Sequence, residues 1–284
     1  MGRSPQLRKG RLVILGGVVA ALALGVFGRL FAPKRLRFPY LTSELSPARY
    51  EALASRPGWR ASKITVAPGI RLNGLVRRPT SPDAPWVLFY QGNDAEMLAV
   101  GQAFLSRVGE DRDWGLAVYA YRGYDSSDGT PKLQDLAADA PEILAQLCAT
   151  EKVSRDHVHL VGFSIGGHFA VRALAVAALT SPKPASLSLL ASVDDIVMYR
   201  RSPWAKLDPG DDLQTRPLLD AIPAPVLVIQ GTADEALAGP GQGRNIAAKL
   251  GTRARYLELP GLKHKALLDH DESIAPVREF IAGH

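Results

Sequence analysis

After residue 85, short apolar runs alternate with longer segments in which apolar residues recur at helical spacing. Runs such as Trp86–Tyr90 and Val226–Gln230 are almost entirely apolar, which is typical of strands buried on both faces of a sheet. Parallel strands are joined by crossover helices, and these helices cover both faces of the sheet. The alternation therefore predicts an α/β fold with a mostly parallel sheet, whose chemistry is expected at the carboxyl ends of its strands.

A turn at Pro68–Gly69 joins the first two predicted strands as an antiparallel pair. The predicted strands are Trp59–Val66, Arg71–Arg78, Trp86–Tyr90, Leu116–Tyr121, His157–Phe163, Ser186–Ala191, Val226–Gln230 and Arg255–Leu259. The predicted helices are Ser46–Ala54, Ala95–Val108, Leu133–Thr150, Ile165–Leu179, Gly243–Leu250 and Ala266–Ile281. The irregular segment between the sixth and seventh strands, at about 194–223, is expected to form a small cap.

Basic residues are concentrated at the N-terminus. Residues 1–37 contain eight of the 34 lysines and arginines and none of the 28 acidic residues. This leaves 26 basic and 28 acidic residues for 38–284, a net charge of −2. A nucleic-acid-binding domain needs a basic face, so no nucleic-acid partner is expected.

An uncharged apolar segment, Leu12–Gly28, follows the basic arm. As a helix it spans about 25 Å, close to the thickness of a bilayer core. We expect residues 1–37 to form a basic arm and a single-pass signal anchor, followed by an α/β domain at 38–284. The positive-inside rule weakly favours a cytoplasmic N-terminus, which places the domain on the outer, periplasmic side. The alternatives are a secreted protein, after signal-peptide cleavage near Ala21–Ala23, and a buried helix of the domain.

The predicted strand His157–Phe163 ends in the sequence Gly-Phe-Ser-Ile-Gly-Gly, which matches the pattern G-x-S-x-G around Ser164. A strained turn between strand and helix lifts such a serine above the sheet, and side chains at the flanking glycine positions would collide with neighbouring backbone. Ser164 is therefore the predicted nucleophile. The alternative is an ordinary strand-to-helix turn that happens to contain a serine.

A nucleophilic serine needs a base, and the base needs an acid that orients it. Asp234 and His264 each follow a predicted strand, so both should meet Ser164 at the same edge of the sheet. Other acids considered are Asp194, Asp195 and Glu235, and other histidines are His168, His270 and His284. His157 and His159 form an H-x-H pair, but without a suitably spaced third ligand no metal site is expected.

The oxyanion of a tetrahedral intermediate needs two N–H donors. The turn itself supplies the backbone N–H of Ile165, directly after the nucleophile. By position, we assign the second donor to the backbone N–H of Asn93, in the loop Gln91–Asp94 after the strand Trp86–Tyr90. Gly92 allows this loop to approach the site closely, although the loop could also be an ordinary turn between a strand and a helix.

Taken together, the motifs GFSIGG, YQGND, YRGYDSSDGTP, GTADE and LPGLKH resemble those of the α/β-hydrolase superfamily. They are most similar to its membrane-tethered, short-capped serine hydrolases, which include palmitoyl-protein thioesterases and fungal cell-polarity hydrolases. The resemblance implies an eight-stranded sheet, a triad of Ser164, Asp234 and His264, and cofactor-free hydrolysis. One departure is Gln91, because the group usually has histidine at this position before Gly-Asn.

The leading functional hypothesis is a serine hydrolase that cleaves a carboxylic ester or thioester of a small-molecule or acylated substrate. A peptidase or amidase with the same triad is a second hypothesis, although a cap of about thirty residues is small for a peptide site. A non-catalytic, membrane-tethered binding protein is the third. The sequence leaves the natural substrate and the oligomeric state open.

Overall fold

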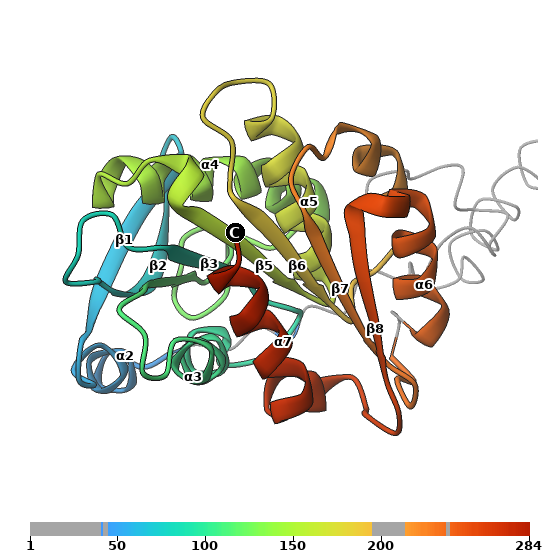
Figure 1. The fold of residues 1–284 in the computed structure, drawn as a ribbon. Coiled ribbons are helices and arrows are strands. Elements are labelled where there is room, and N and C mark those ends of the chain that lie inside the picture. The colour runs from blue at the N-terminus through green and yellow to red at the C-terminus, as the bar shows by residue number, and fades with distance from the viewer. Residues whose placement is uncertain (1–40, 42–44, 195–213, 237–238) are drawn as a thin grey trace, which may run out of the picture. The chain divides into compact units, whose positions relative to one another are not determined.

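The computed structural model describes residues 41, 45–194, 214–236 and 239–284. Its core is an eight-stranded sheet with the strand order β1-β2-β4-β3-β5-β6-β7-β8 (Figure 1). Strand β2 is antiparallel to its neighbours β1 and β4, and every pair from β4 to β8 is parallel. The predicted α/β architecture with a mostly parallel sheet is confirmed.

The element bounds follow the sequence pattern closely. The strands are β1 (Trp59–Ala67), β2 (Ile70–Arg77), β3 (Trp86–Tyr90), β4 (Gly115–Tyr119), β5 (Val158–Phe163), β6 (Ser186–Leu190), β7 (Val226–Gly231) and β8 (Ala254–Leu259). The α-helices are α2 (Pro47–Ala54), α3 (Met97–Val108), α4 (Leu133–Glu151), α5 (Ile165–Ala177), α6 (Gly239–Leu250) and α7 (Asp271–Ala282). Short 3₁₀ helices include Arg216–Ala221 and Lys265–Leu268.

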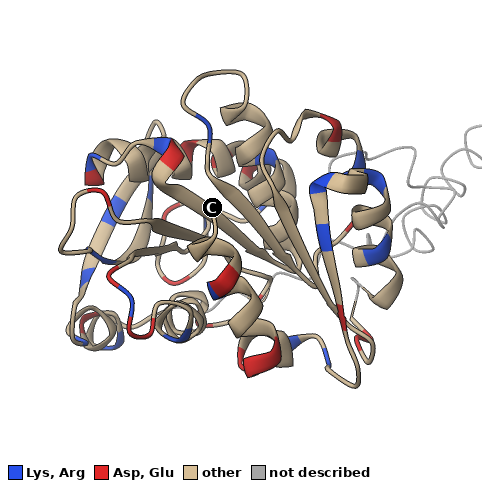
Figure 2. Cartoon of the chain, viewed as in Figure 1, with Lys and Arg blue, Asp and Glu red and all other residues tan. Residues whose placement is uncertain are grey.

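Five of the six inner strands, β4, β3, β5, β6 and β7, are buried at every position. None contains a charged Lys, Arg, Asp or Glu residue, and Figure 2 shows such residues around the sheet rather than along its centre. Helices α3 and α7 pack together on one face, and α4 and α5 pack together on the other (Figure 1). Burial on both faces explains why these strands are apolar runs rather than alternating ones.

The prediction of one helix over Ala266–Ile281 is wrong. A 3₁₀ turn, Lys265–Leu268, comes first, and α7 begins only at Asp271. His270 between them has an extended backbone, with φ −103° and ψ 135°. The hydroxyl of Ser273 donates to the carbonyl oxygens of Leu267 and His270, which stabilises the break. Hydrophobic periodicity continues through such a break, so it did not show in the sequence pattern.

Two predicted segments lie largely outside the described residues. The N-terminal span Leu12–Gly28 is one, and most of the predicted cap, residues 195–213, is the other. No helix among the residues that the structure does describe has the length and apolar character needed to cross a membrane. The anchor and the cap stay predictions.

Candidate active site

Ser164 lies at the junction of β5 and α5 in a strained backbone conformation. Its φ of 56° and ψ of −124° are rare for a residue with a side chain, and such strain is concentrated at functional sites. Two hydrogen bonds hold the turn: Ser164 N–H donates to the Leu190 carbonyl at 2.9 Å, and Val193 N–H donates to the Ser164 carbonyl at 3.3 Å. The turn is thus tied to the carboxyl end of β6.

The glycines around Ser164 permit close backbone contacts. A Cβ atom on Gly166 would lie 2.1 Å from the carbonyl oxygen of Tyr90 at the end of β3. A Cβ on Gly162 would lie 2.6 Å from the Cα of Gly167. Both distances are far below van der Waals contact, so any side chain at these positions requires backbone movement. The steric reason for the G-x-S-x-G pattern is therefore present in the structure.

Asp234 and His264 meet across the loops that follow β7 and β8. Nδ1 of His264 lies 2.9 Å from Oδ2 of Asp234. A carboxylate only accepts hydrogen bonds, so Nδ1 carries a proton, and in the neutral imidazole Nε2 is then the acceptor. This is the tautomer that a general base needs.

Asp234 is 2% exposed, and its ionisation depends on this burial and on three hydrogen-bond donors around its carboxyl group. Burial raises the pKa of its carboxyl group, but the hydrogen bonds and charge of His264, with hydrogen bonds from Ala236 N–H and the Gln230 amide, outweigh it. The net result is a pKa below the ordinary value. Asp234 is thus held as a carboxylate beside His264.

Phe163 connects the serine side of the site to the histidine side. It directly precedes Ser164, and its ring centroid lies 4.7 Å from that of His264. A Cβ on Gly92 would lie 2.8 Å from the Phe163 ring and 3.1 Å from the Cβ of Ser164. Ser164, His264 and the loop Gln91–Asp94 therefore gather around one phenylalanine.

The alternative acids and bases have other partners or positions. Asp194 forms an ion pair with Arg216, whose Nε lies 3.1 Å from its Oδ1, and Asp195 lies outside the described residues. Glu235 is exposed.

The other histidines also have different positions or partners. His270 is the N-cap residue of α7. Buried His168 contacts the hydroxyl of Thr215 at 3.0 Å, and buried His159 contacts that of Ser186 at 2.8 Å. His284 contacts the Phe280 carbonyl. Among the residues that the structure describes, no group of His, Cys, Asp and Glu side chains is arranged to hold a metal ion.

The two backbone N–H groups predicted as oxyanion donors belong to Ile165 and Asn93. Ile165 is the first residue of α5, and N–H groups in a first helical turn have no acceptor within their own helix. Asn93 lies in the loop after β3, where the side-chain Oδ1 accepts hydrogen bonds from the Tyr124 hydroxyl at 2.7 Å and from Leu41 N–H at 2.9 Å. These bonds use the acceptor of the side chain rather than the backbone N–H that we assign as donor.

No protein-family model matches the chain. A curated relative, alpha/beta hydrolase domain-containing protein 17B of Xenopus tropicalis, is 27% identical over 161 residues, which are 55% of this chain and 53% of the relative. The chain thus spans about half the length of that protein.

Solved structures extend the comparison to the whole fold. An esterase of Pyrococcus furiosus superposes with a TM-score of 0.65 at 14% identity, covering 88% of this chain and 98% of that one. An esterase of Rhodococcus sp. ECU1013 superposes with a TM-score of 0.60 at 17% identity, covering 78% and 98%. The chain has the α/β-hydrolase fold.

Sequence reasoning missed several contacts around the candidate site. Lys265, next to His264, forms an ion pair with Asp94 in the loop after β3, at 2.7 Å. The hydroxyl of Tyr121 donates to the carbonyl of Gln91 at 2.8 Å, from the loop after β4. The YRGYD motif pointed to that loop, but it did not show which atoms it contacts.

Gln91 is fully buried, and neither polar atom of its side-chain amide has a hydrogen-bond partner among the described residues. Its backbone carbonyl, in contrast, lies against the nucleophile turn, 2.4 Å from where a Cβ on Gly166 would be. The departure from histidine at this position therefore changes a buried side chain within the loop Gln91–Asp94, next to the turn that carries Ser164.

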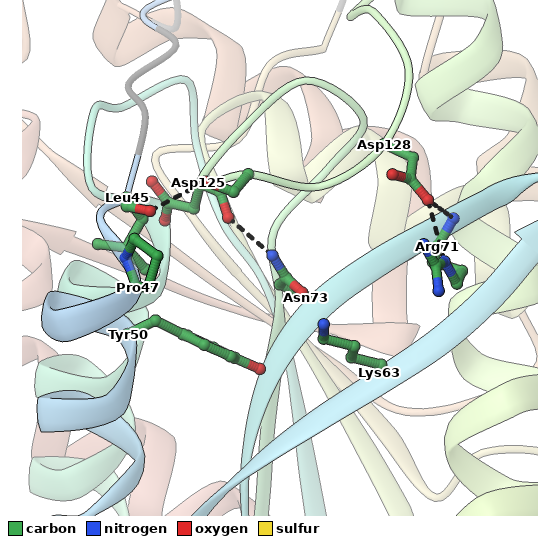
Figure 3. Close-up of a pocket in the computed structure, with 9 residues that line it drawn as sticks. Leu45, Pro47, Tyr50, Lys63, Arg71, Asn73, Asp125 and Asp128 are labelled. Atoms are coloured by element: carbon green, nitrogen blue, oxygen red, sulfur yellow. Dashed lines mark hydrogen bonds and ion pairs between the residues drawn. The ribbon is translucent and has the colours of Figure 1, made fainter.

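A pocket of about 250 Å³ lies elsewhere on the α/β-hydrolase domain, among α2, β1, β2 and the loop after β4 (Figure 3). Tyr50, Lys63 and Asn73 extend toward it from the helix and the two strands. Arg71 and Asp128 on its wall form an ion pair at 3.3 Å. None of Ser164, Asp234 and His264 lines this pocket.

Proposed function

We propose that the protein is a serine hydrolase that cleaves a carboxylic ester or thioester through an acyl-enzyme on Ser164. The observation that supports this most directly is the Asp234–His264 hydrogen bond of 2.9 Å beside a serine in a strained elbow. The alpha/beta hydrolase name of the curated relative and the esterase names of two structural neighbours agree with it.

The proposed reaction follows from the proton positions. His264 Nε2 accepts the proton of Ser164 Oγ as that oxygen attacks the acyl carbonyl carbon. His264 then gives this proton to the departing alcohol or thiol, and an ester forms between Ser164 and the acyl group. A water molecule, deprotonated by the same histidine, attacks this ester; the bond to Ser164 Oγ breaks, His264 returns the proton to that oxygen, and the acid is released. Asp234 keeps Nδ1 protonated and stabilises the imidazolium formed in each half.

The charge on the attacked oxygen is stabilised by the backbone N–H groups of Ile165 and Asn93. Because Ile165 lies at the start of α5, the dipole of the helix N-terminus adds to this stabilisation. Every step of the proposed reaction uses groups of the protein itself, so the reaction needs no cofactor. The substrate is proposed to be a small molecule or an acylated molecule of the kind handled by short-capped, membrane-tethered members of the superfamily.

A fluorophosphonate probe tests the proposal, because it reacts only with an activated serine. Wild-type protein should be labelled, and Ser164→Ala should not. With p-nitrophenyl acetate and butyrate, Ser164→Ala should lose about 10³-fold or more in kcat. Ser188→Ala is the matched control, because it removes a buried serine hydroxyl of β6 that has no hydrogen-bond partner among the described residues. Unlabelled, folded wild-type protein would refute the enzyme proposal.

The bond type requires a separate comparison. Oxygen and sulfur esters of the same acyl chain, offered at matched concentrations, report the preference as a ratio of kcat/KM values. A graded series of acyl lengths on the fragment from Arg37 onward defines the acyl pocket. Cleavage of amides at comparable rates would instead favour a peptidase or amidase.

We also propose that residues 1–37 anchor the protein in a membrane, with the hydrolase domain on the outer, periplasmic side. The uncharged run Leu12–Gly28 after a basic arm supports this. The full chain should remain with membranes after a carbonate wash, and protease added outside should digest the domain. Recovery of a free chain that begins after Ala23 would indicate a cleaved signal peptide.

A further inference from the structure

The loop after β4, residues 120–132, contacts the oxyanion loop Gln91–Asp94 through two buried tyrosine hydroxyls. Tyr121 donates to the Gln91 carbonyl at 2.8 Å, and Tyr124 donates to Oδ1 of Asn93 at 2.7 Å. The two side chains are 3% and 1% exposed. The oxyanion loop is therefore held at its first and third residues by groups from a single neighbouring loop.

A third bond continues this contact into α3. The carboxylate of Asp125 accepts a hydrogen bond from Leu98 N–H in the first turn of α3, at 2.6 Å. The segment that leads from the oxyanion loop into this helix is thus held by the same neighbouring loop as well. Three bonds from residues 121–125 fix the path of the chain from the end of β3 to the start of α3.

The loop that provides these groups is itself strained and firmly held. Asp125 and Ser126 both have positive φ, 43° and 61°. Their conformation is maintained by Asn73 on β2, whose side chain donates to the Asp125 carbonyl at 3.0 Å. Two non-glycine residues in the left-handed region cost free energy, and strained residues of this kind cluster at functional sites.

The same stretch of the loop is also fixed to a helix. Arg122 forms a bidentate ion pair with Asp139 of α4, and both side chains are largely buried. Bidentate pairs fix orientation as well as position. Tyr121 and Tyr124 therefore extend from a support that is attached both to the sheet and to a helix.

The direction of the two bonds suits a role in catalysis. Both go to acceptors of the oxyanion loop, the Gln91 carbonyl and the Asn93 side chain, and neither involves the backbone N–H of Asn93 that we assign as oxyanion donor. An oxyanion donor stabilises the transition state only when it is fixed at hydrogen-bonding distance beforehand, and a displacement of 1 Å costs about 100-fold in rate.

We propose that Tyr121 and Tyr124 are positioning residues that fix the oxyanion loop, so that the Asn93 N–H faces the acyl oxygen above Ser164. This inference rests on the proposed function. It adds that two phenol hydroxyls, which never contact the substrate, determine how well the intermediate is stabilised. It also assigns a role to the YRGYD motif.

The test uses Tyr124→Phe and Tyr121→Phe, each of which removes one hydroxyl and leaves the ring. Tyr119→Phe is the matched control, because Tyr119 is equally buried and its hydroxyl contacts Ser62 Oγ at 3.2 Å. We expect Tyr124→Phe to lower kcat for p-nitrophenyl acetate about 10-fold, with KM within about twofold of wild type. The rate of labelling by a fluorophosphonate should fall by a similar factor.

A purely structural role would lower the melting temperature and leave the kinetics of the folded fraction unchanged. Activity of Tyr121→Phe and Tyr124→Phe equal to that of Tyr119→Phe, in a protein whose Ser164→Ala form is inactive, would overturn this inference alone. Wild-type protein without Ser164-dependent turnover would overturn the proposed function and this inference together. Loss of kcat in both variants at a melting temperature close to that of Tyr119→Phe supports it.

Discussion

Gln230 and His264 donate hydrogen bonds to the same carboxylate oxygen, Oδ2 of Asp234, each at 2.9 Å. The other oxygen, Oδ1, accepts the N–H of Ala236 at 2.9 Å. Asp234 therefore cannot rotate without losing several bonds at once. The orientation of His264 depends on a glutamine at the end of β7 that has no part in the chemistry itself.

Replacing Gln230 tests whether the orientation of His264 depends on it. We expect Gln230→Leu to lower kcat/KM about 10-fold, because a hydrogen bond to a charged group contributes about 1.5–3 kcal/mol. Asp234→Asn, which disturbs the tautomer of His264, should lower kcat by about 10³–10⁴. Gln102→Leu is the matched control, since Gln102 is equally buried and donates to the Leu53 carbonyl at 2.8 Å, between α3 and α2. Equal activity of the two leucine variants would show that Gln230 does not orient the acid.

Gly166 and Gly167 should respond differently to alanine. At Gly166 the obstacle is the backbone carbonyl of Tyr90, 2.1 Å away, whereas at Gly167 it is the side chain of Ser192, with Oγ at 2.0 Å. Both alanine variants should lose most activity and stability. Adding Ser192→Gly should restore much of both to Gly167→Ala, because it removes the obstructing atoms, and should not help Gly166→Ala. Thermal unfolding and probe labelling of the four variants check this, and equal rescue of both would contradict it.

Two buried histidines predict a loss of stability in mild acid. Burial lowers the pKa of His168 to about 3 and that of His159 to about 4. Between these values and the ordinary pKa near 6.5, the unfolded chain binds protons that the folded chain does not, so the free energy of unfolding falls as the pH falls. At pH 5 each histidine should cost about 2 kcal/mol relative to pH 7.5.

Urea unfolding at the two pH values measures this loss. His168→Gln should be less stable than wild type at pH 7.5 but should lose less on acidification. Phe169→Leu destabilises the same helix without removing a titrating group, so it should keep the wild-type difference between the two pH values. A wild-type stability that is unchanged between pH 7.5 and pH 5 would contradict the prediction.

The ion pair between Asp94 and Lys265 connects the oxyanion loop with the residue after His264. Lys265 is about two-thirds exposed, and ion pairs of this kind contribute about 0.2–1 kcal/mol. We therefore expect Lys265→Met to lower kcat/KM about two- to fivefold at low salt, with a smaller effect at 0.5 M salt. Lys263→Met makes the same change on the other side of His264 and serves as the control. A loss of equal size in both variants would indicate general sensitivity of this loop.

The sequence was sufficient to predict the sheet and the positions of Ser164, Asp234 and His264 at its edge. Buried parallel strands must be apolar, and a strained serine turn requires glycines, so both leave a local pattern. The structure places the Asp234 and His264 side chains in contact, in agreement with their predicted positions at the carboxyl ends of strands.

The contacts that hold the site residues in place left no such pattern in the sequence. Tyr124 and Asn93 are 31 residues apart, and Gln230 looks like one more residue of an apolar strand. The order in which strands pair decides such contacts, because β4 lies on the outer side of β3 and brings its loop against the oxyanion loop. The break before α7 was missed for a different reason, since its cause is a set of hydroxyl and backbone bonds within an apolar stretch that keeps helical spacing.

The residues of the site are spread along the chain, so they are synthesised at different times. Asn93 and Ser164 are made first, whereas Asp234 and His264 belong to the last third of the sequence, and β7 and β8 must join the sheet before the two halves meet. A serine without its base is a weak nucleophile. A growing or truncated chain that lacks β8 and His264 should therefore not hydrolyse esters. Hydrolase activity would show that the C-terminal strand has joined the sheet correctly.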